Sequence, residues 1–213
     1  MENKELFENI AKLAIKREGI QDLLTALELT DFYDAPASTK YHLSIYGGLC
    51  QHSLDVYYAM INSLPHTIYN KDFMNKYSLE SRAIVSLFHD VCKANVYFPS
   101  IRNVKKYDFD REKYELNAYM QSMIKQDAIG EFVWEQEQTF TFDDSFPLGH
   151  GEKSLYLISK YIDLTEDEAI AIRYHMGAFR NEDIQNLNKV YSKYPLALAL
   201  HISDMIATYI IEE

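Results

Sequence analysis

The feature that most constrains the fold is the apolar run PLALALHISDMIATYII at residues 195–211. Its apolar side chains recur with helical spacing, and Pro195 suits the first turn of a helix. A helix this apolar is expected to be buried, yet it carries Asp204, and a buried carboxylate is costly without a charged partner or a metal ion. His201 lies one turn before Asp204, on the same side of the helix. The fold must therefore bring partners to a charge inside an apolar helix.

The rest of the chain also favours helices. Only 7 of the 213 residues are glycine and 5 are proline, and helix-forming residues outnumber β-branched runs. Ser78 is a candidate N-cap, and Thr165 with Glu168 forms a capping box before a segment that Gly177 closes. Helices are expected over residues 3–18, 20–29, 47–64, 78–95, 149–162, 166–176 and 195–211. The sequence therefore predicts a mainly α protein.

Residues 96–147 break this helical pattern. Their first part is charged and irregular, whereas GEFVWEQEQTFTFDDSFP alternates bulky and polar residues, as a strand or hairpin does. We interpret 96–147 as an insertion with a short β-hairpin on one face of a helical body. The whole chain, 1–213, is expected to form a single domain, with the helices of residues 1–35 packing on its core.

Composition limits the classes of partner. The net charge of −11 argues against an extended nucleic-acid surface, because such surfaces need clustered Lys and Arg. No stretch approaches the roughly 20 apolar residues of a membrane span, and the amphipathic N-terminus is unlike a signal peptide. The two cysteines, Cys50 and Cys92, have neither metal nor redox spacing. We expect a cytoplasmic protein with no membrane partner, and a homo-oligomer is compatible with the sequence.

Histidine and aspartate side chains recur at helix and helix-entry positions. The candidate metal ligands are His52, His89, Asp90, His150, His175 and Asp204. Imidazole with carboxylate suits divalent transition metals; we favour iron or manganese, with nickel, cobalt, zinc and magnesium as alternatives. If Asp90 is shared, the set suffices for two ions, which together can activate a hydroxide and clamp a phosphoryl group. Lys93 lies one turn after Asp90, where it can meet an anionic oxygen of a substrate.

Five segments carry a family resemblance. In order, GGLCQHSLDV, SLFHDVCK, GHGEKS, AIRYHMG and LHISDMIATY resemble the signature segments of the HD-domain superfamily of metal-dependent phosphohydrolases, over roughly residues 40–210. The resemblance implies an HD-type helical bundle, with the family pattern H…HD…D on His52, His89-Asp90 and Asp204. The stretch YHLSIYGGLCQHSL is similar to the HD domain of bacterial 3′–5′ exoribonucleases and to short phage and bacterial HD proteins.

His150 and His175 resemble the extra ligands of six-ligand HD proteins. Two such groups are the cyclic-dinucleotide phosphodiesterases of the HD-GYP type and the mixed-valent diiron oxygenases. The chain lacks the GYP segment of the first group. Both histidines could instead bind substrate phosphate in a single-metal enzyme. Of the remaining histidines, His201 is interpreted as a structural group that holds a ligand, and His42 either caps the pocket or is a solvated loop residue.

The first functional hypothesis is a metal-dependent phosphohydrolase that cleaves a small phosphoester, a nucleotide or a phosphodiester, with metal-activated hydroxide. Asp90 and Lys93 are the candidate catalytic residues. Substrate contacts are predicted for Lys93, Arg102, Lys105 and Arg180. One alternative is an HD-type diiron oxygenase acting on a small hydroxylated or phosphonate substrate. The other is a non-catalytic module that binds metal or nucleotide.

Overall fold

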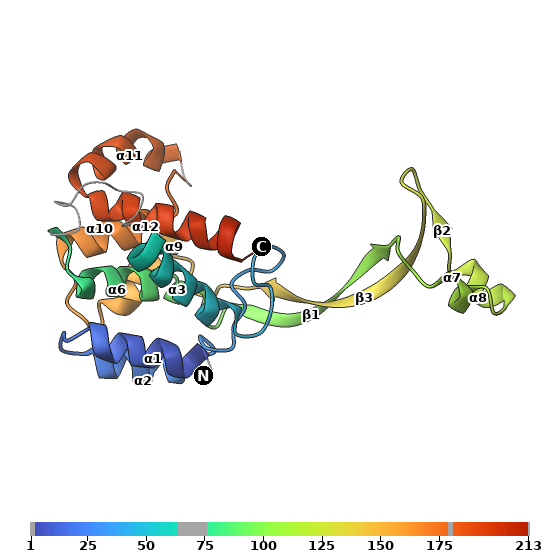
Figure 1. Cartoon of the computed structure of the whole chain (residues 1–213), viewed down its shortest axis with the longest axis horizontal. Coiled ribbons are helices and arrows are strands. Elements are labelled where there is room, and N and C mark those ends of the chain that lie inside the picture. Colours follow the sequence, from blue (N-terminus) through green and yellow to red (C-terminus); the bar gives the residue numbers. More distant parts are fainter. Residues whose placement is uncertain (1–2, 64–75, 179–180, 213) are drawn as a thin grey trace. The chain divides into compact units, whose positions relative to one another are not determined.

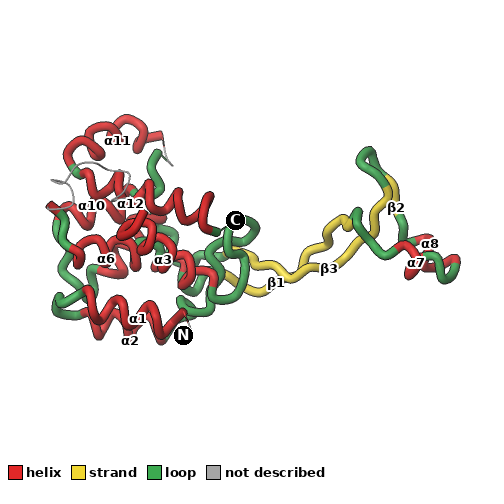
Figure 2. Tube along the Cα trace, in the orientation of Figure 1, coloured by secondary structure: helices red, strands yellow, loops and turns green. Residues whose placement is uncertain are grey.

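The structure, a computed structural model, describes residues 3–63, 76–178 and 181–212. It is mainly helical with a small three-stranded antiparallel sheet, which confirms the predicted mainly α class. The path of the chain and its helices and strands can be followed in Figure 2. The chain divides into two compact units, one formed by Met1–Tyr97 with Phe142–Glu213 and the other by Phe98–Thr141.

The first unit is helical and contains every candidate metal ligand. Its helices are α1 (Asn3–Ala14), α2 (Ile20–Glu28), α3 (Gly48–Tyr58), α6 (Leu79–Phe88), α9 (His150–Ile158), α10 (Glu166–Tyr174), α11 (Asn181–Lys193) and α12 (Pro195–Ile206). A 3₁₀ turn, η2 (Val91–Lys93), follows α6, and the π-helical turns η1 (Ala59–Ser63) and η3 (Ala207–Ile211) extend α3 and α12. Helix α12 packs against α10, α3 and α6 (Figure 1).

Helix α12 is buried, as its composition predicts. Its side chains Leu196, Ala197 and Leu200 have no exposed surface. They join a core in which Phe7 meets Phe32 and Phe88 edge to face, with ring centroids 5.3 and 5.5 Å apart. In the described ranges no single helix combines the length and apolar content of a membrane span; α11 and α12 reach them only jointly, across a 110° bend.

Local sequence signals account for several helix ends. The Thr165–Glu168 capping box opens α10 as predicted, and Ser78 caps α6 by accepting a hydrogen bond from the Ser81 amide. The pair Gly47-Gly48 opens α3 for steric reasons. Gly47 has φ of 76°, and a Cβ on Gly48 would collide with the carbonyl of Leu43. The chain can therefore turn sharply into the helix that carries His52.

Three predicted helices extend several residues too far. The helix expected over residues 3–18 ends at Ala14, the one over 78–95 at Phe88 and the one over 149–162 at Ile158. Asp90 leaves the helical conformation, with φ −110° and ψ 17°, and its carbonyl accepts a hydrogen bond from the Lys93 amide. This short turn brings the side chains of Asp90 and Lys93 together, so tertiary contacts overrode the helical pattern.

The second unit is built around two long strands. Strand β1 (Tyr97–Lys106) neighbours β3 (Glu131–Phe142), whose other edge pairs antiparallel with β2 (Lys125–Gln126), Lys125 opposite Phe132. Two short helices, α7 (Arg111–Tyr114) and α8 (Ala118–Ser122), lie between β1 and β2 in the chain. The predicted short hairpin is therefore a larger element, with a third strand and two helical turns.

Candidate metal centre

The six predicted ligands lie in one buried cluster, although they come from five parts of the chain. His52 is on α3, His89 and Asp90 follow α6, His150 opens α9, His175 follows α10, and Asp204 is on α12. Their donor atoms form overlapping groups in which all members are within 4.8 Å of one another. The imidazoles of His52, His89 and His175 are at most 1% exposed. The residues thus meet where an ion could be enclosed.

Asp90 lies at the centre of the cluster. Its Oδ1 is 2.6 Å from His150 Nε2 and 3.3 Å from His175 Nε2. Its Oδ2 is 2.7 Å from Lys93 Nζ and 3.7 Å from His52 Nε2. Burial opposes ionisation, but the charge of Lys93 and the hydrogen bond with His150 hold the pKa of Asp90 well below its usual value. The two carboxylate oxygens therefore face two different sets of side chains.

Asp204 and His52 form the other side of the cluster. His52 Nε2 is 3.2 Å from Asp204 Oδ1 and 3.3 Å from His89 Nε2. Burial lowers the pKa of His52, but hydrogen bonds to Asp204 and Glu212 outweigh it and raise the pKa to about 9. Burial lowers the pKa of His89 to about 3, so this ring is neutral at pH 7. A neutral imidazole is the form that binds a metal ion.

The imidazoles are held through their Nδ1 atoms. His89 and His175 donate from Nδ1 to the carbonyls of Ser86 and Ile172, at 2.8 and 2.7 Å. Because a carbonyl only accepts hydrogen bonds, Nδ1 of each ring carries a proton. The neutral His89 ring therefore presents the lone pair of Nε2 to the cluster, and Nε2 of His175 faces Asp90 Oδ1 at 3.3 Å. His175 Nε2 is buried and has no hydrogen-bond partner among the described residues. This pattern of fixed tautomers is typical of metal-binding histidines.

The donor set fits a borderline divalent metal ion. Two nitrogens bound at about 2.1 Å to one ion lie roughly 3.0–3.4 Å apart at ordinary coordination angles. The His52–His89 separation of 3.3 Å falls in this range. Without an ion, the protonated His52 donates from Nε2 to the lone pair of His89 across this distance, and a cation between the two rings would take the place of that proton. The predicted ligands therefore suit a divalent transition-metal ion.

A pocket of about 560 Å³ opens onto the cluster. The ligand side chains His52, Asp90 and Asp204 contribute to its lining, together with Lys93. Burial lowers the pKa of Lys93, but the Asp90 carboxylate outweighs this and raises it, so the ammonium stays charged. The rest of the lining is Tyr41, His42, Met176, Met205, Thr208, Tyr209 and Glu212. The cluster and a charged ammonium group therefore border the same pocket.

Sequence reasoning missed two neighbours of the ligands. Glu212 Oε1 lies 2.8 Å from His52 Nδ1, and Cys92 Sγ lies 3.3 Å from His150 Nδ1. Burial raises the pKa of the Cys92 thiol to about 12, so it is neutral. Nothing in the sequence distinguished Glu212 from the other acidic residues, whereas Cys92 was visible as a near neighbour of Asp90. The carbonyl of His175 accepts a hydrogen bond from His201 Nδ1 at 2.7 Å.

The predicted substrate contacts have different outcomes. Lys93 contacts Asp90 and lines the pocket. Arg102 and Lys105 belong to the second unit, where they pair with Glu137 at 3.3 Å and Asp127 at 2.5 Å. Their contact with a substrate stays a prediction. Arg180 lies outside the described residues.

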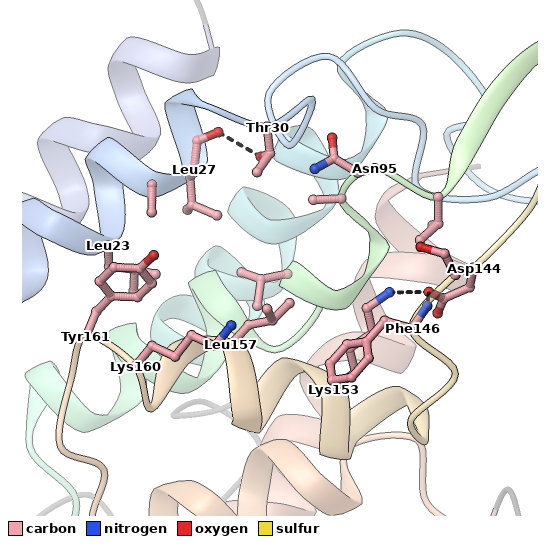
Figure 3. Close-up of a pocket in the computed structure, with 15 residues that line it drawn as sticks. Leu23, Leu27, Thr30, Asn95, Asp144, Phe146, Lys153, Leu157, Lys160 and Tyr161 are labelled. Atoms are coloured by element: carbon pink, nitrogen blue, oxygen red, sulfur yellow. Dashed lines mark hydrogen bonds and ion pairs between the residues drawn. The ribbon is translucent and has the colours of Figure 1, made fainter.

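A second cavity, of about 290 Å³, lies beside α2, η2 and α9 (Figure 3). Apolar side chains such as Leu23, Leu27 and Leu157 line much of it, and Lys153 meets Asp144 at its edge, 2.6 Å apart. Lys153 is in the first turns of α9, where a cation opposes the helix dipole unless an anion is near. Asp144 is that anion.

No protein-family model matches the chain, and neither the curated proteins nor the solved structures contain a match. The function is therefore inferred from the residues of the cluster and their geometry.

Proposed function

We propose that the protein is an HD-type metal-dependent phosphohydrolase that holds two divalent transition-metal ions and cleaves a small phosphoester. One observation carries the proposal: Asp90 lies between two pairs of imidazoles, with Oδ1 toward His150 and His175 and Oδ2 toward His52 and His89. A carboxylate placed in this way can be shared by two ions. The ordered segments that resemble HD proteins agree with this interpretation.

The ligands would divide into two groups around Asp90. His52, His89 and Asp204, whose donor atoms form one group, would hold one ion together with Asp90. Asp90 would share the other ion with His150 and His175, whose Nε2 atoms lie 2.6 and 3.3 Å from its Oδ1. Iron or manganese is favoured by the mixture of imidazole and carboxylate. When bound, two such ions would supply Lewis acidity and lower the pKa of a coordinated water. The Nδ1 hydrogen bonds of His89 and His175 keep their Nε2 atoms aimed at the site.

Lys93 is proposed to bind the phosphoryl group. Its ammonium group is charged, lines the pocket and lies 2.7 Å from the carboxylate of Asp90. A fixed cation at this position attracts an anionic oxygen and stabilises negative charge that develops on it during hydrolysis. In this arrangement Asp90 both orients Lys93 and joins the two groups of ligands.

The pocket supports a small, nucleotide-like substrate. Its volume of about 560 Å³ is in the usual range for small-molecule sites. Tyr41 and Tyr209 are 82% and 62% exposed, and with Met176 and Met205 they offer flat, apolar contacts on which a base could stack. Whether a phosphomonoester or a phosphodiester is cleaved is part of the test.

The test is metal content combined with turnover. Protein purified without chelator or an immobilised-metal column is expected to hold about two transition-metal ions per chain by mass spectrometry. It is expected to release phosphate from nucleotides or to cleave a diester such as bis-(p-nitrophenyl) phosphate. Asp204→Asn should lose metal and turnover, whereas the exposed Asp22→Asn should keep both.

Other outcomes separate the alternatives. Iron-containing protein that consumes O₂ and leaves phosphoesters intact would support a diiron oxygenase instead. Bound metal without turnover of any phosphoester would support a non-catalytic module. Protein without bound or acquired metal would contradict the proposal entirely.

A further inference from the structure

Glu212 is a buried carboxylate that contacts a predicted metal ligand. Its side chain is 1% exposed, and Oε1 lies 2.8 Å from Nδ1 of His52. Since the carboxylate only accepts, Nδ1 of His52 donates the hydrogen bond, and Nε2 is left to face Asp204 and His89. His52 is therefore held from behind by one carboxylate while its other nitrogen faces the cluster.

The backbone before Glu212 departs from α-helical geometry. In a straight α-helix, residues eight apart point about 80° away from each other. Asp204 and Glu212 have this spacing, yet both contact His52. The π-helical turn Ala207–Ile211 lies between them, and the Glu212 amide donates to the carbonyl of Ala207, five residues earlier, at 3.0 Å. A π turn contains more residues than an α turn, so it carries Glu212 back toward the face of Asp204.

The second carboxylate oxygen of Glu212 is also informative. Oε2 is buried without a hydrogen-bond partner among the described residues, as is Nε2 of His42. His42, His52 and Glu212 form a group whose donor atoms lie within 4.8 Å of one another, and all three line the pocket. An unpaired buried carboxylate oxygen costs free energy, so packing alone does not favour this position.

We infer that Glu212 is a positioning residue that holds His52 for metal binding, and that the π turn Ala207–Ile211 places the Glu212 side chain beside His52. The inference rests on the proposed metal site. The carboxylate fixes the tautomer of His52, orients its ring and makes Nε2 a stronger donor. One helix thus provides two residues to the site: Asp204 contacts Nε2 of His52, and Glu212 contacts Nδ1.

The test is Co²⁺ binding to metal-depleted protein, followed by visible absorption. Loss of an outer partner of this kind typically weakens metal affinity about 10–100-fold. Glu212→Ala is expected to show that loss of Co²⁺ affinity together with an altered Co²⁺ spectrum. Glu212→Gln can still accept a hydrogen bond from Nδ1, so its loss of affinity should be smaller. The exposed Glu18→Ala is the matched control and should bind like the wild type.

A double-mutant cycle separates positioning from general stability. If Glu212 acts through His52, adding Glu212→Ala to His52→Ala should cause no further loss of Co²⁺ affinity. An equal loss in both backgrounds, or single variants that bind as tightly as the wild type, would overturn the inference and leave the proposed function intact. Failure of the wild type to bind Co²⁺ would overturn both.

Discussion

Two lysine–aspartate pairs in the helical unit look alike but have different surroundings. Lys93 and Asp90 are 2.7 Å apart, and Lys153 and Asp144 are 2.6 Å apart. Asp144 also accepts from the amide of Phe146, and its pair with Lys153 borders a largely apolar cavity (Figure 3). Asp90, by contrast, is also contacted by imidazole nitrogens on both of its oxygens.

The difference indicates which pair is structural and which is functional. In a single buried ion pair with local hydrogen bonds, each charged group already has its partner. Removing one of the two groups mainly lowers the stability of the fold. Asp90 instead has the Lys93 ammonium at 2.7 Å and four imidazole Nε2 atoms within 3.7 Å, more polar neighbours than a single ion pair needs. Asp90 is therefore the position at which a change should affect ligand binding more than folding.

The largest effect is expected from Asp90→Asn. The neutral amide cannot serve as a shared carboxylate ligand, so metal affinity should fall by more than the roughly 10–100-fold typical of losing an outer partner. Metal analysis and Co²⁺ titration measure it. Asp144→Asn is the matched control and should keep full metal content. Equal loss of metal in the two variants would show that the two lysine–aspartate pairs do not differ in function.

The next effect concerns the Oδ1 side of Asp90. His150→Ala and His175→Ala should each reduce the metal content from about two ions per chain to about one, because both rings face that oxygen. Mass spectrometry of the purified variants provides the count. Two ions retained in both variants would mean that these histidines bind substrate or serve the structure.

Lys93→Met should separate metal binding from turnover. The loss of one fixed charge donor at a reacting oxygen typically costs about 10²–10³ in turnover. We expect that decrease in phosphoester hydrolysis, with metal content unchanged. Lys160→Met, which alters a lysine beside the other cavity, is the control. Normal turnover in Lys93→Met would remove this residue from the proposed mechanism.

Lys153→Met should act on stability instead. The change leaves the Asp144 carboxylate without its cation, at a cost of about 1–3 kcal/mol in the free energy of unfolding. Urea unfolding measures that cost, and the double variant Lys153→Met, Asp144→Asn should recover part of it. A loss of bound metal at full stability would show that this pair also serves the metal centre.

The smallest effect is a pH dependence at a third pair, Arg17 with Glu168, whose closest atoms are 2.6 Å apart. Burial raises the pKa of Glu168, but the hydrogen bonds from Arg17 and the Thr165 amide outweigh it and lower the pKa below 4.5. Its contribution to stability is therefore complete above about pH 4.5 and declines as the pH falls through the lowered value.

Urea unfolding at several pH values tests this prediction. The stability difference between wild type and Glu168→Gln should be constant from pH 7 to about pH 5 and shrink below that. A difference that stays constant down to pH 3 would mean that ionisation of Glu168 contributes nothing to stability.

Much of the helical architecture could be predicted from the sequence. The apolar period of residues 195–211, the capping box at Thr165 and the Gly47-Gly48 entry are local signals, and each forms the expected structure. The six candidate ligands could also be named, because His and Asp at helical positions, in segments that resemble a known family, are chemically distinctive. They lie together in the structure.

Other features depended on tertiary contacts between distant segments. Helix α6 ends at Phe88 although its pattern continues, because Asp90 turns out of the helix toward Lys93 and the imidazoles. Glu212 is one of 32 acidic residues, and only the π turn after α12 brings it to His52, 160 positions away in the chain. The sequence by itself determined the mainly α class and which residues can bind a metal ion, since propensity and ligand chemistry are local properties. Only the packing of α3, α6, α9, α10 and α12 decided which nitrogen meets which oxygen, because those contacts depend on how helices far apart in the chain are positioned.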